Sequence, residues 1–465
     1  GGDSDDFSID PLGGDIRLIG SLDYERKHQY QFAARVVNEI YTDSTITINV
    51  NDISEQSKIT DGQTFYAAES TKESIGYLDI TDFKDSDSSL DIELPFKISD
   101  KGLISADNLD NSSYDVDVTL DEQTNTVTIV KLPDIKDPLY SQQWHLNNRS
   151  QDAFSNSGGK TRADMHLQQT IIDGCRDNNN QPVGCTGKGV VIAIVDEGLE
   201  IAHEDLQDNV VEDGSWDFVN NDSDPTMDAT GGDHGTAVAG LAAAVANQVG
   251  GRGVAPSASL KGFNFLLKQG DGNQIKALGG DANFTPAQDV DIFNQSYGSS
   301  RRGDATLDGD IANTSKYGVK SLRKGKGAIY IKSAGNGFEH LQGANCTAGF
   351  SCQNSNMDPI HTVPFQMVVG ATNANGVKSS YSTAGASVWI SSPGGEDGTD
   401  NPAMITTDQS GCHQGYSTST YSSRHTISRD LDLNCNYTKG FNGTSSAAPT
   451  LAGAVALLLE ANPDL

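Results

Sequence analysis

Three polar residues stand where apolar segments of the chain end or begin. Asp196 follows the run VVIAIV, His234 precedes an alanine-rich segment, and Ser445 precedes the apolar stretch LAGAVALLL. A serine hydroxyl becomes a nucleophile when a histidine takes its proton, and an acid can hold that histidine in the right tautomer. Each residue alone also has an ordinary interpretation, as a helix cap, a structural histidine or a turn. Together they supply all the groups that nucleophilic hydrolysis needs, with Ser445 as the nucleophile.

A fourth residue, Asn336, lies in the glycine-rich segment SAGNG at the end of another apolar run. Its side-chain amide can donate a hydrogen bond to the oxyanion that forms when a serine attacks a carbonyl carbon. The backbone N–H of Ser445 can donate beside it. The ordinary interpretation is an asparagine in a turn. We expect Asn336 to stabilise the oxyanion.

Such residues need a framework that brings the ends of distant strands together. Apolar runs at 190–195, 327–335 and 366–372 have the composition of buried parallel strands, and Ala/Gly-rich helices alternate with them. The pattern predicts an α/β doubly wound, mostly parallel sheet. In such sheets the active site lies at the carboxyl ends of the strands, which is where Asp196 and Asn336 stand.

The first 135 residues show a different pattern. The segment 7–36 has a shorter echo at 96–120, and alternating strands follow at 44–52 and 125–134. Alternation interrupted by Gly, Asp and Asn predicts antiparallel strands in β-sandwich modules. The predicted domains are a β module at 1–54, a second β module at 55–136 and a catalytic domain at 137–465.

Acidic residues outnumber basic residues by 63 to 32, which gives a formal net charge of -31. This excess argues against a nucleic acid partner, because Lys and Arg bind the phosphate backbone. It suits the binding of a hard cation such as calcium by oxygen ligands. The longest apolar run, 447–459, is too short and too interrupted to span a bilayer. No signal peptide is visible, and we expect the N-terminus to be truncated.

The six cysteines form three locally close pairs without the CxxC spacing of a zinc site: Cys175 with Cys185, Cys346 with Cys352, and Cys412 with Cys435. An even number clustered in this way predicts disulfides that close surface loops in an oxidising compartment. Buried free thiols are the alternative. With the acidity, the cysteines predict a secreted or cell-surface protein.

Residues 137–465 resemble the subtilase family of serine endopeptidases along nearly their whole length, and the kexin/furin branch most of all. The resemblance rests on DPLYSQQWHL, DEGLEIAHEDL, VNNDSDP, DIFNQSYG and SAGNG, and on the chain order Asp, His, Ser. It implies that Asp196, His234 and Ser445 form a catalytic triad acting on protein or peptide substrates. It also implies that Ser296, Tyr297 and Gly298 bind the substrate backbone.

The resemblance further implies calcium as a cofactor. One family site joins the mature N-terminus, an acid after the catalytic strand and a loop beyond the histidine helix. The matching residues are Asp137, Asp205, Val245, Asn247, Val249 and Gly251. The loop residues recur every two positions, so successive oxygens can point to one centre. A second site of the kexin branch matches Asp217, Asp222 and Asp224, for which a solvated acidic loop is the alternative.

Specificity is where the chain departs from the branch. Furin-like enzymes have an acid three residues after the S-x-G strand, where this chain has Arg301, and another acid where it has Thr383. A further calcium site is therefore expected to be absent, and strict dibasic specificity is not implied. Asp358 is the nearest candidate for the floor of a pocket that prefers a basic residue before the scissile bond.

The first N-terminal module resembles a cadherin repeat in its F-x-I-D start, its LDYE motif and its V-N-D strand end. Glu25 and Asp52 match cadherin calcium ligands, whereas Arg35, Val36 and Val37 replace the intervening D-x-D. The resemblance implies calcium-dependent adhesion; surface acids on a hairpin are the alternative.

Two further functions compete with a secreted endopeptidase. A protease fold that has lost its activity could serve as an adhesion or scaffold protein, but Asp196, His234, Asn336 and Ser445 are all present. A hydrolase of non-peptide substrates is less consistent with the peptide-binding strand at 296–298.

Overall fold

The computed structural model divides the chain into two compact units, Gly1–Ile135 and Lys136–Leu465. It describes the strands of the first 134 residues. From residue 135 onward it describes all residues except 168–169, 178, 228–233, 299–308, 339, 342–343, 346–351 and 418–430. Each unit is taken by itself below.

The first unit is made of antiparallel strands. Its six-stranded sheet has the order β10-β11-β12-β6-β5-β4: β10 (Ile104–Asp107), β11 (Ser113–Asp121), β12 (Thr126–Lys131), β6 (Gln63–Ala67), β5 (Thr42–Asn49) and β4 (Gln29–Val36). Three strand pairs accompany it: β1 (Phe7–Ile9) with β2 (Ile16–Leu18), β3 (Ser21–Leu22) with β8 (Ile92–Glu93), and β7 (Tyr77–Leu78) with β9 (Ile98–Ser99).

The predicted alternating strands at 44–52 and 125–134 correspond to β5 and β12. The sheet takes strands from both sides of the predicted boundary after residue 54, so the division into two modules stays a prediction. Glu25 and Asp52 lie outside the described residues.

The second unit is built on a six-stranded sheet in which every neighbouring pair is parallel. Its order is β16 (Ser259–Phe263), β15 (Val191–Val195), β17 (Ile292–Gln295), β18 (Ile329–Ser333), β21 (Gln366–Thr372) and β22 (Val388–Pro393). The apolar runs form the central strands because a parallel sheet is buried on both faces. The prediction of a parallel α/β sheet is confirmed.

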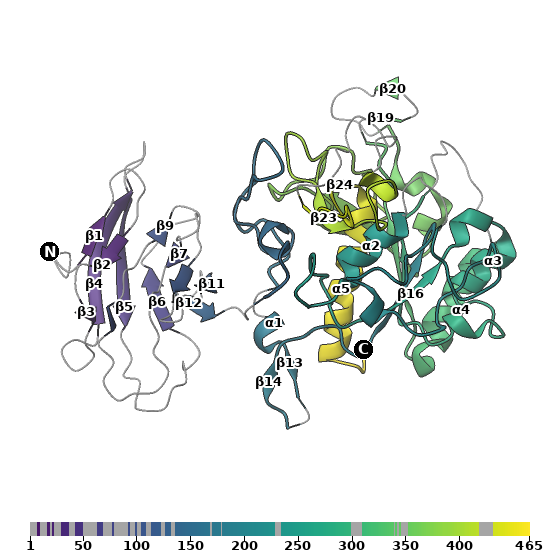
Figure 1. The fold of residues 1–465 in the computed structure, drawn as a ribbon, viewed down its shortest axis with the longest axis horizontal. Coiled ribbons are helices and arrows are strands. Elements are labelled where there is room, and N and C mark those ends of the chain that lie inside the picture. Colours follow the sequence, from purple (N-terminus) through teal and green to yellow (C-terminus); the bar gives the residue numbers. More distant parts are fainter. Residues whose placement is uncertain are drawn as a thin grey trace. The chain divides into compact units, whose positions relative to one another are not determined.

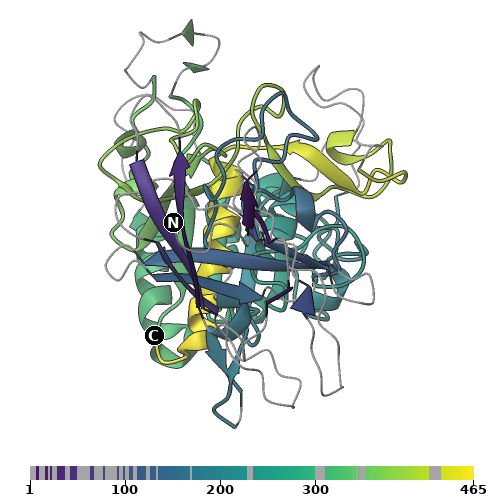
Figure 2. The same cartoon turned by 90° about the vertical axis from the view of Figure 1, so that its left-hand side faces the viewer.

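Helices cover both faces of this sheet. α5 (Thr444–Ala461) crosses the middle of the unit in Figure 1 and again in Figure 2, and α2 (His234–Ala243) packs against it. On the other face α3 (Asp271–Ala277) packs on α4 (Gly309–Ser321), over a core that includes Phe263, Phe293 and Tyr330. In α2, residues 235–243 are all buried and most are Ala or Gly, so the two helix backbones can approach closely.

The remaining elements are short. They are α1 (Thr170–Asp173), β13 (Cys175–Arg176), β14 (Pro182–Val183), β19 (His340–Leu341), β20 (Ala344–Asn345), β23 (Met404–Thr407), β24 (Tyr437–Phe441), η2 (Tyr140–Gln142), η3 (Gln207–Asn209), η4 (Phe265–Lys268), η5 (Thr285–Ala287), η6 (Arg323–Gly325), η7 (Ser355–Met357), η8 (Pro359–Thr362) and η9 (Gly415–Ser417). Among the described residues, only α5 is long and apolar enough to cross a bilayer, and it is mostly buried inside the unit.

The strand order reverses at β15, which lies between β16 and β17. In doubly wound sheets, ligands bind in the crevice at the carboxyl ends of the strands where the order reverses. Asp196 directly follows β15 and Ser296 directly follows β17. The fold therefore brings residues from two of the predicted motifs to the same edge of the sheet.

Candidate active site

Asp196 and His234 are joined by a hydrogen bond. Asp196 is fully buried, and its Oδ1 lies 2.8 Å from His234 Nδ1. The N–H of Glu197 donates to the same oxygen. His234 begins α2, and its ring packs edge-on against Phe441. With the carboxylate on Nδ1, the ring can accept a proton at Nε2. The two residues predicted to act as acid and base thus lie together.

Ser445 lies in the first turn of α5, against the end of β17. Its Oγ donates to the carbonyl oxygen of Ser296 at 3.0 Å, and Ser296 Oγ donates to the carbonyl oxygen of Ser445 at 2.9 Å. Ser445 is half-buried, whereas the neighbouring Ser446 is fully buried. Of the two adjacent serines, Ser445 is therefore the one that a substrate can reach.

Two hydrogen bonds fix the oxygen of the Asn336 side-chain amide. Its Oδ1 accepts hydrogen bonds from the backbone N–H and the hydroxyl of Thr444, both at 2.9 Å. These bonds occupy the oxygen and leave Nδ2 turned toward Gly443, where an added Cβ would lie 3.1 Å from Nδ2. Gly443 has φ +106°, and its N–H donates to the hydroxyl of Tyr381. Asn336 Nδ2 and the start of α5 therefore face the same space.

The segment Ser296–Gly298 continues from β17 past the end of β18. The carbonyl oxygen of Tyr297 accepts from Ser333 Oγ at 3.2 Å, and its ring packs on Phe265. Arg301 lies outside the described residues. Thr383, where an acid is expected in furin-like enzymes, is buried, and its hydroxyl accepts from the N–H of Gly337. This bond supports the turn that carries Asn336.

Asp358 is buried beside this segment. Its Oδ1 accepts from the N–H of Ile360 and caps η8, and its Oδ2 lies 3.8 Å from His361 Nε2. Lys332 in β18 is also buried, and burial lowers the pKa of its amine to about 8. The sequence interpretation missed Lys332 and His361. The available signal was a lysine inside the apolar run IYIKS.

The residues of the first predicted calcium site lie together. The N–H of Asn247 donates to Asp137 Oδ1 at 2.7 Å, and its side-chain amide donates to Asp205 Oδ1 at 3.0 Å. The N–H of Gly251 donates to Asp205 Oδ2, and that of Val245 to the carbonyl oxygen of Asp205. Val249 donates its N–H to Asn247 Oδ1.

The electrostatics of this cluster fit a cation. Asp137 and Asp205 are both buried, and burial raises the pKa of Asp205 to about 8 and raises the pKa of Asp137 above its usual value. Asp137 Oδ2 accepts no hydrogen bond among the described residues, although Arg252 lies 3.6 Å away. A cation is the group that would keep two such carboxylates ionised.

The second acidic cluster differs. The carboxylate of Asp217 already accepts from four N–H groups, including the side chains of Asn220 and Asn264. Asp222 Oδ1 accepts from the N–H of Asp224, whose own Oδ1 accepts from Thr226. These hydrogen bonds already use several of the carboxylate oxygens, and calcium at this cluster stays a prediction.

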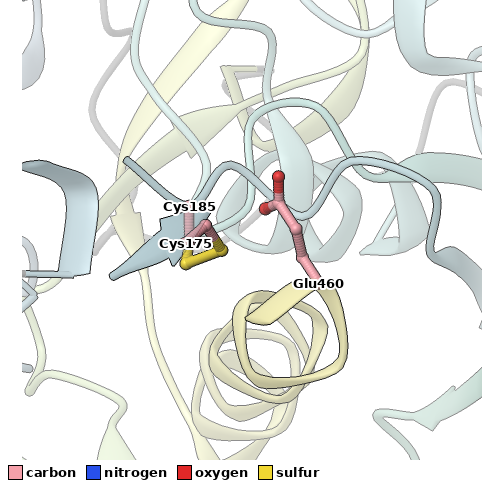
Figure 3. Close-up of side chains that lie close together, drawn as sticks. All are labelled: Cys175, Cys185 and Glu460. Carbon is pink, nitrogen blue, oxygen red and sulfur yellow. A yellow bond between two sulfur atoms is a disulfide. The ribbon is translucent and has the colours of Figure 1, made fainter. Parts of the chain in front are cut away.

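Two of the three predicted disulfides are present, Cys175–Cys185 and Cys412–Cys435. Cys352 is also disulfide-bonded, and its predicted partner Cys346 lies outside the described residues. Figure 3 shows the carboxylate of Glu460 beside the first disulfide, a grouping that could suggest a metal site.

The disulfide leaves no thiolate for a metal in that grouping. Glu460 Oε2 instead accepts the N–H groups of Thr186 and Gly187 at 2.5 and 2.6 Å. It ties the C-terminal end of α5 to the chain before β15.

Comparison with known proteins agrees with this geometry. A model of the subtilase family of peptidases matches residues 187–465. This chain belongs to the subtilase family. It is 41% identical over 341 residues to the Aeromonas extracellular serine protease of Aeromonas sobria, an alignment that covers 70% of this chain and 52% of that protein. It is 33% identical over 336 residues to kexin of Saccharomyces cerevisiae, covering 71% of this chain and 34% of kexin.

Among solved structures, this subtilase is similar to the serine protease of Aeromonas sobria. The TM-score is 0.65 at 40% identity, over 72% of this chain and 56% of that protein. The chain thus spans about half the length of the Aeromonas protease. The relatives include both extracellular proteases and kexins, which agrees with the kexin-like resemblance.

Proposed function

We propose that this subtilase is a serine endopeptidase in which Ser445 is the nucleophile, His234 the general base and Asp196 the residue that orients the base. The hydrogen bond between Asp196 Oδ1 and His234 Nδ1 carries the proposal, because it leaves the other ring nitrogen to receive the serine proton. Asn336, whose oxygen is held by Thr444, donates its Nδ2 hydrogen to the oxyanion.

Ser445 Oγ donates to the Ser296 carbonyl oxygen in this structure, and we propose that it turns to His234 when a substrate binds. His234 Nε2 takes the proton of Ser445 as Oγ bonds to the carbonyl carbon of the peptide, and the carbonyl electrons move onto the oxygen. The Asp196 carboxylate stabilises the imidazolium, which then protonates the leaving amine as the C–N bond breaks. Water attacks the acyl-enzyme with His234 again as base, and this step releases the acid and restores the Ser445 hydroxyl.

The test compares two adjacent serines. Ser445→Ala should abolish peptidase activity and labelling by a fluorophosphonate, because triad members act as a unit. Ser446→Ala, which changes a buried neighbour, should retain both. Labelling of Ser446, or wild-type turnover in Ser445→Ala, would show that the nucleophile is assigned wrongly. Absence of labelling in the folded wild-type protein would favour the adhesion or scaffold alternative.

We also propose a structural calcium ion held by the carboxylates of Asp137 and Asp205, the side chain of Asn247, and the carbonyl oxygens of Val245, Val249 and Gly251. A bound ion would supply positive charge to two buried carboxylates. A second ion at Asp217, Asp222 and Asp224 belongs to the same proposal. This second ion is tested by a separate calcium titration of a variant in which Asp222 and Asp224 are replaced.

For specificity, we propose Ser296, Tyr297 and Gly298 as the strand that pairs with the substrate, and Asp358 as the charged floor of the pocket for the residue before the scissile bond, P1. Asp358 is buried beside Tyr297, as such a floor requires. The expected preference is Lys or Arg at P1. A cleavage profile on a peptide library dominated by Leu, Phe or Tyr at P1 would contradict it.

The disulfides support the proposal that the protein is secreted, and its Aeromonas sobria relative is named as extracellular. We propose that residues 1–54 and 55–136 form cadherin-like β modules ahead of the peptidase domain at 137–465. Their antiparallel strands support a β architecture. Calcium-dependent aggregation of beads coated with residues 1–136 would test adhesion, and its absence would leave these modules without that role.

A further inference from the structure

Among the described residues, the buried amine of Lys332 has no hydrogen-bond partner. Its side chain is 1% exposed. By contrast, Lys261 in β16 is buried to a similar extent, yet its amine donates to Asp289 and to the carbonyl oxygen of Pro286. Burying an ammonium group without a partner is costly. Lys332 therefore needs an explanation that Lys261 does not.

The amine of Lys332 lies under the proposed substrate strand. Nζ is 4.3 Å from the centre of the Tyr297 ring, and a Cβ added to Gly298 would be 3.9 Å from it. In the sheet, Lys332 lies opposite Gln295, two residues before Tyr297. The pairing of β17 with β18 thus fixes the position of Lys332 near the carboxyl ends of these two strands.

Charged and titratable groups surround the amine on several elements. Asp358, before η8, is its strongest charged neighbour, and Asp196, after β15, is the next. The charge of Lys332 also acts on His361 of η8: it lowers the pKa of the His361 imidazole further than burial alone does. Tyr297 keeps its phenol protonated because burial raises its pKa. Asp358 is therefore the negative charge that the ammonium group of Lys332 offsets most.

We propose that Lys332 determines P1 specificity: its charged amine opposes Asp358 and disfavours a basic P1 side chain, whereas its neutral amine lets Asp358 bind one. This inference rests on the proposed function. A guanidinium entering past Gly298 would meet the like charge of Lys332 before its pairing with Asp358 is complete. A leucine at P1 carries no charge and would be much less affected.

The charge state can be changed within the usual assay range. Burial lowers the pKa of Lys332 to about 8, so the amine loses its proton as the pH rises from 7 to 9. The preference for Arg over Leu at P1 should rise over the same range. A pH effect that changes catalysis of both substrates equally cancels in the ratio of their kcat/KM values.

The experiment measures kcat/KM for two peptides that differ only in Arg or Leu at P1, from pH 6.5 to 9.5. In the wild-type enzyme the Arg/Leu ratio should rise by a factor approaching about 10 between pH 7 and 9. Lys332→Met should give a high ratio that does not change with pH. Lys261→Met, the matched buried lysine, should behave as wild type. Asp358→Asn should lower the ratio in either background.

Other outcomes are equally informative. An unchanged ratio at pH 7 in Lys332→Met, or a pH-dependent ratio that persists in it, would overturn the inference. If Lys332→Met does not fold, Lys332→Gln gives the same comparison with a neutral polar side chain, and a wild-type ratio that is flat with pH is by itself a contradiction. Failure of the wild type to cleave either peptide, with no fluorophosphonate labelling, would refute the proposed function instead.

Discussion

Replacing Gly443 with alanine should separate backbone strain from loss of catalysis. Gly443 precedes α5 with φ +106° and ψ 170°, a conformation almost restricted to glycine. A Cβ there would lie 3.1 Å from Asn336 Nδ2, closer than side-chain carbons normally approach. The substitution therefore strains the turn and also pushes the proposed oxyanion donor.

The two effects have different sizes. Backbone strain of this kind costs about 1–3 kcal/mol and should lower the melting temperature by a few degrees. The hydrogen bonds from Thr444 to Asn336 Oδ1 prevent the amide from rotating freely away. A displaced Nδ2 should therefore lose its bond to the oxyanion, which corresponds to a fall of about 10²–10³ in kcat.

Gly411→Ala is the matched control. Gly411 has φ +101°, and a Cβ added there meets no atom within 4 Å. It should lower the melting temperature to a similar extent and leave kcat unchanged. The assay combines thermal unfolding with kcat on one peptide substrate for both variants. If Gly443→Ala keeps kcat within about 3-fold of wild type, Asn336 is not the oxyanion donor inferred here.

Three further predictions concern the base, the calcium cluster and a buried histidine. Asp196→Asn should lower kcat about 10⁴-fold with little change in melting temperature, because the ring would lose its correct tautomer; wild-type turnover would contradict this. A chelator should lower the melting temperature of the wild type but not of Asp205→Asn, since an ion bound only by the native state stabilises it; equal shifts would exclude Asp205 as a ligand. Burial lowers the pKa of His145 to about 3, so unfolding takes up a proton below pH 6.5 and stability falls as the pH drops. Between pH 6.5 and 5, thermal unfolding should show His145→Leu losing about 1 kcal/mol per pH unit less than wild type, and parallel curves would contradict it.

The reactive residues could be predicted from sequence because their signals are local. An apolar run that ends in Asp196, and an alanine-rich helix that begins at His234, need no knowledge of tertiary contacts. Parallel strands then bring their carboxyl ends to one edge. The choice between Ser445 and Ser446 could not be made as firmly, since only burial in the structure distinguishes them.

Residues whose role depends on strand register were harder to predict. Lys332 lies under Tyr297 because β17 and β18 pair with Lys332 opposite Gln295. The bonds from Thr444 to Asn336 likewise join the first residue of α5 to a distant turn. A sequence motif can name a residue such as Asn336 without showing which atoms it meets. For Asp217 the motif could not show that neighbouring amide groups also surround the carboxylate.

The placement of Ser445 on α5 has a consequence for folding kinetics. Asp196, Asn336 and Ser445 come from successive parts of the chain, and each of the sheet's neighbouring strand pairs is parallel, so the contacts that bring these residues together close long loops. Non-local contacts of this kind form slowly. During synthesis Ser445 also leaves the ribosome after the base and the oxyanion donor. Because Thr444 of α5 also holds the Asn336 side chain, a nascent chain without docked α5 lacks both the nucleophile and a fixed oxyanion donor, so it cannot cut neighbouring chains.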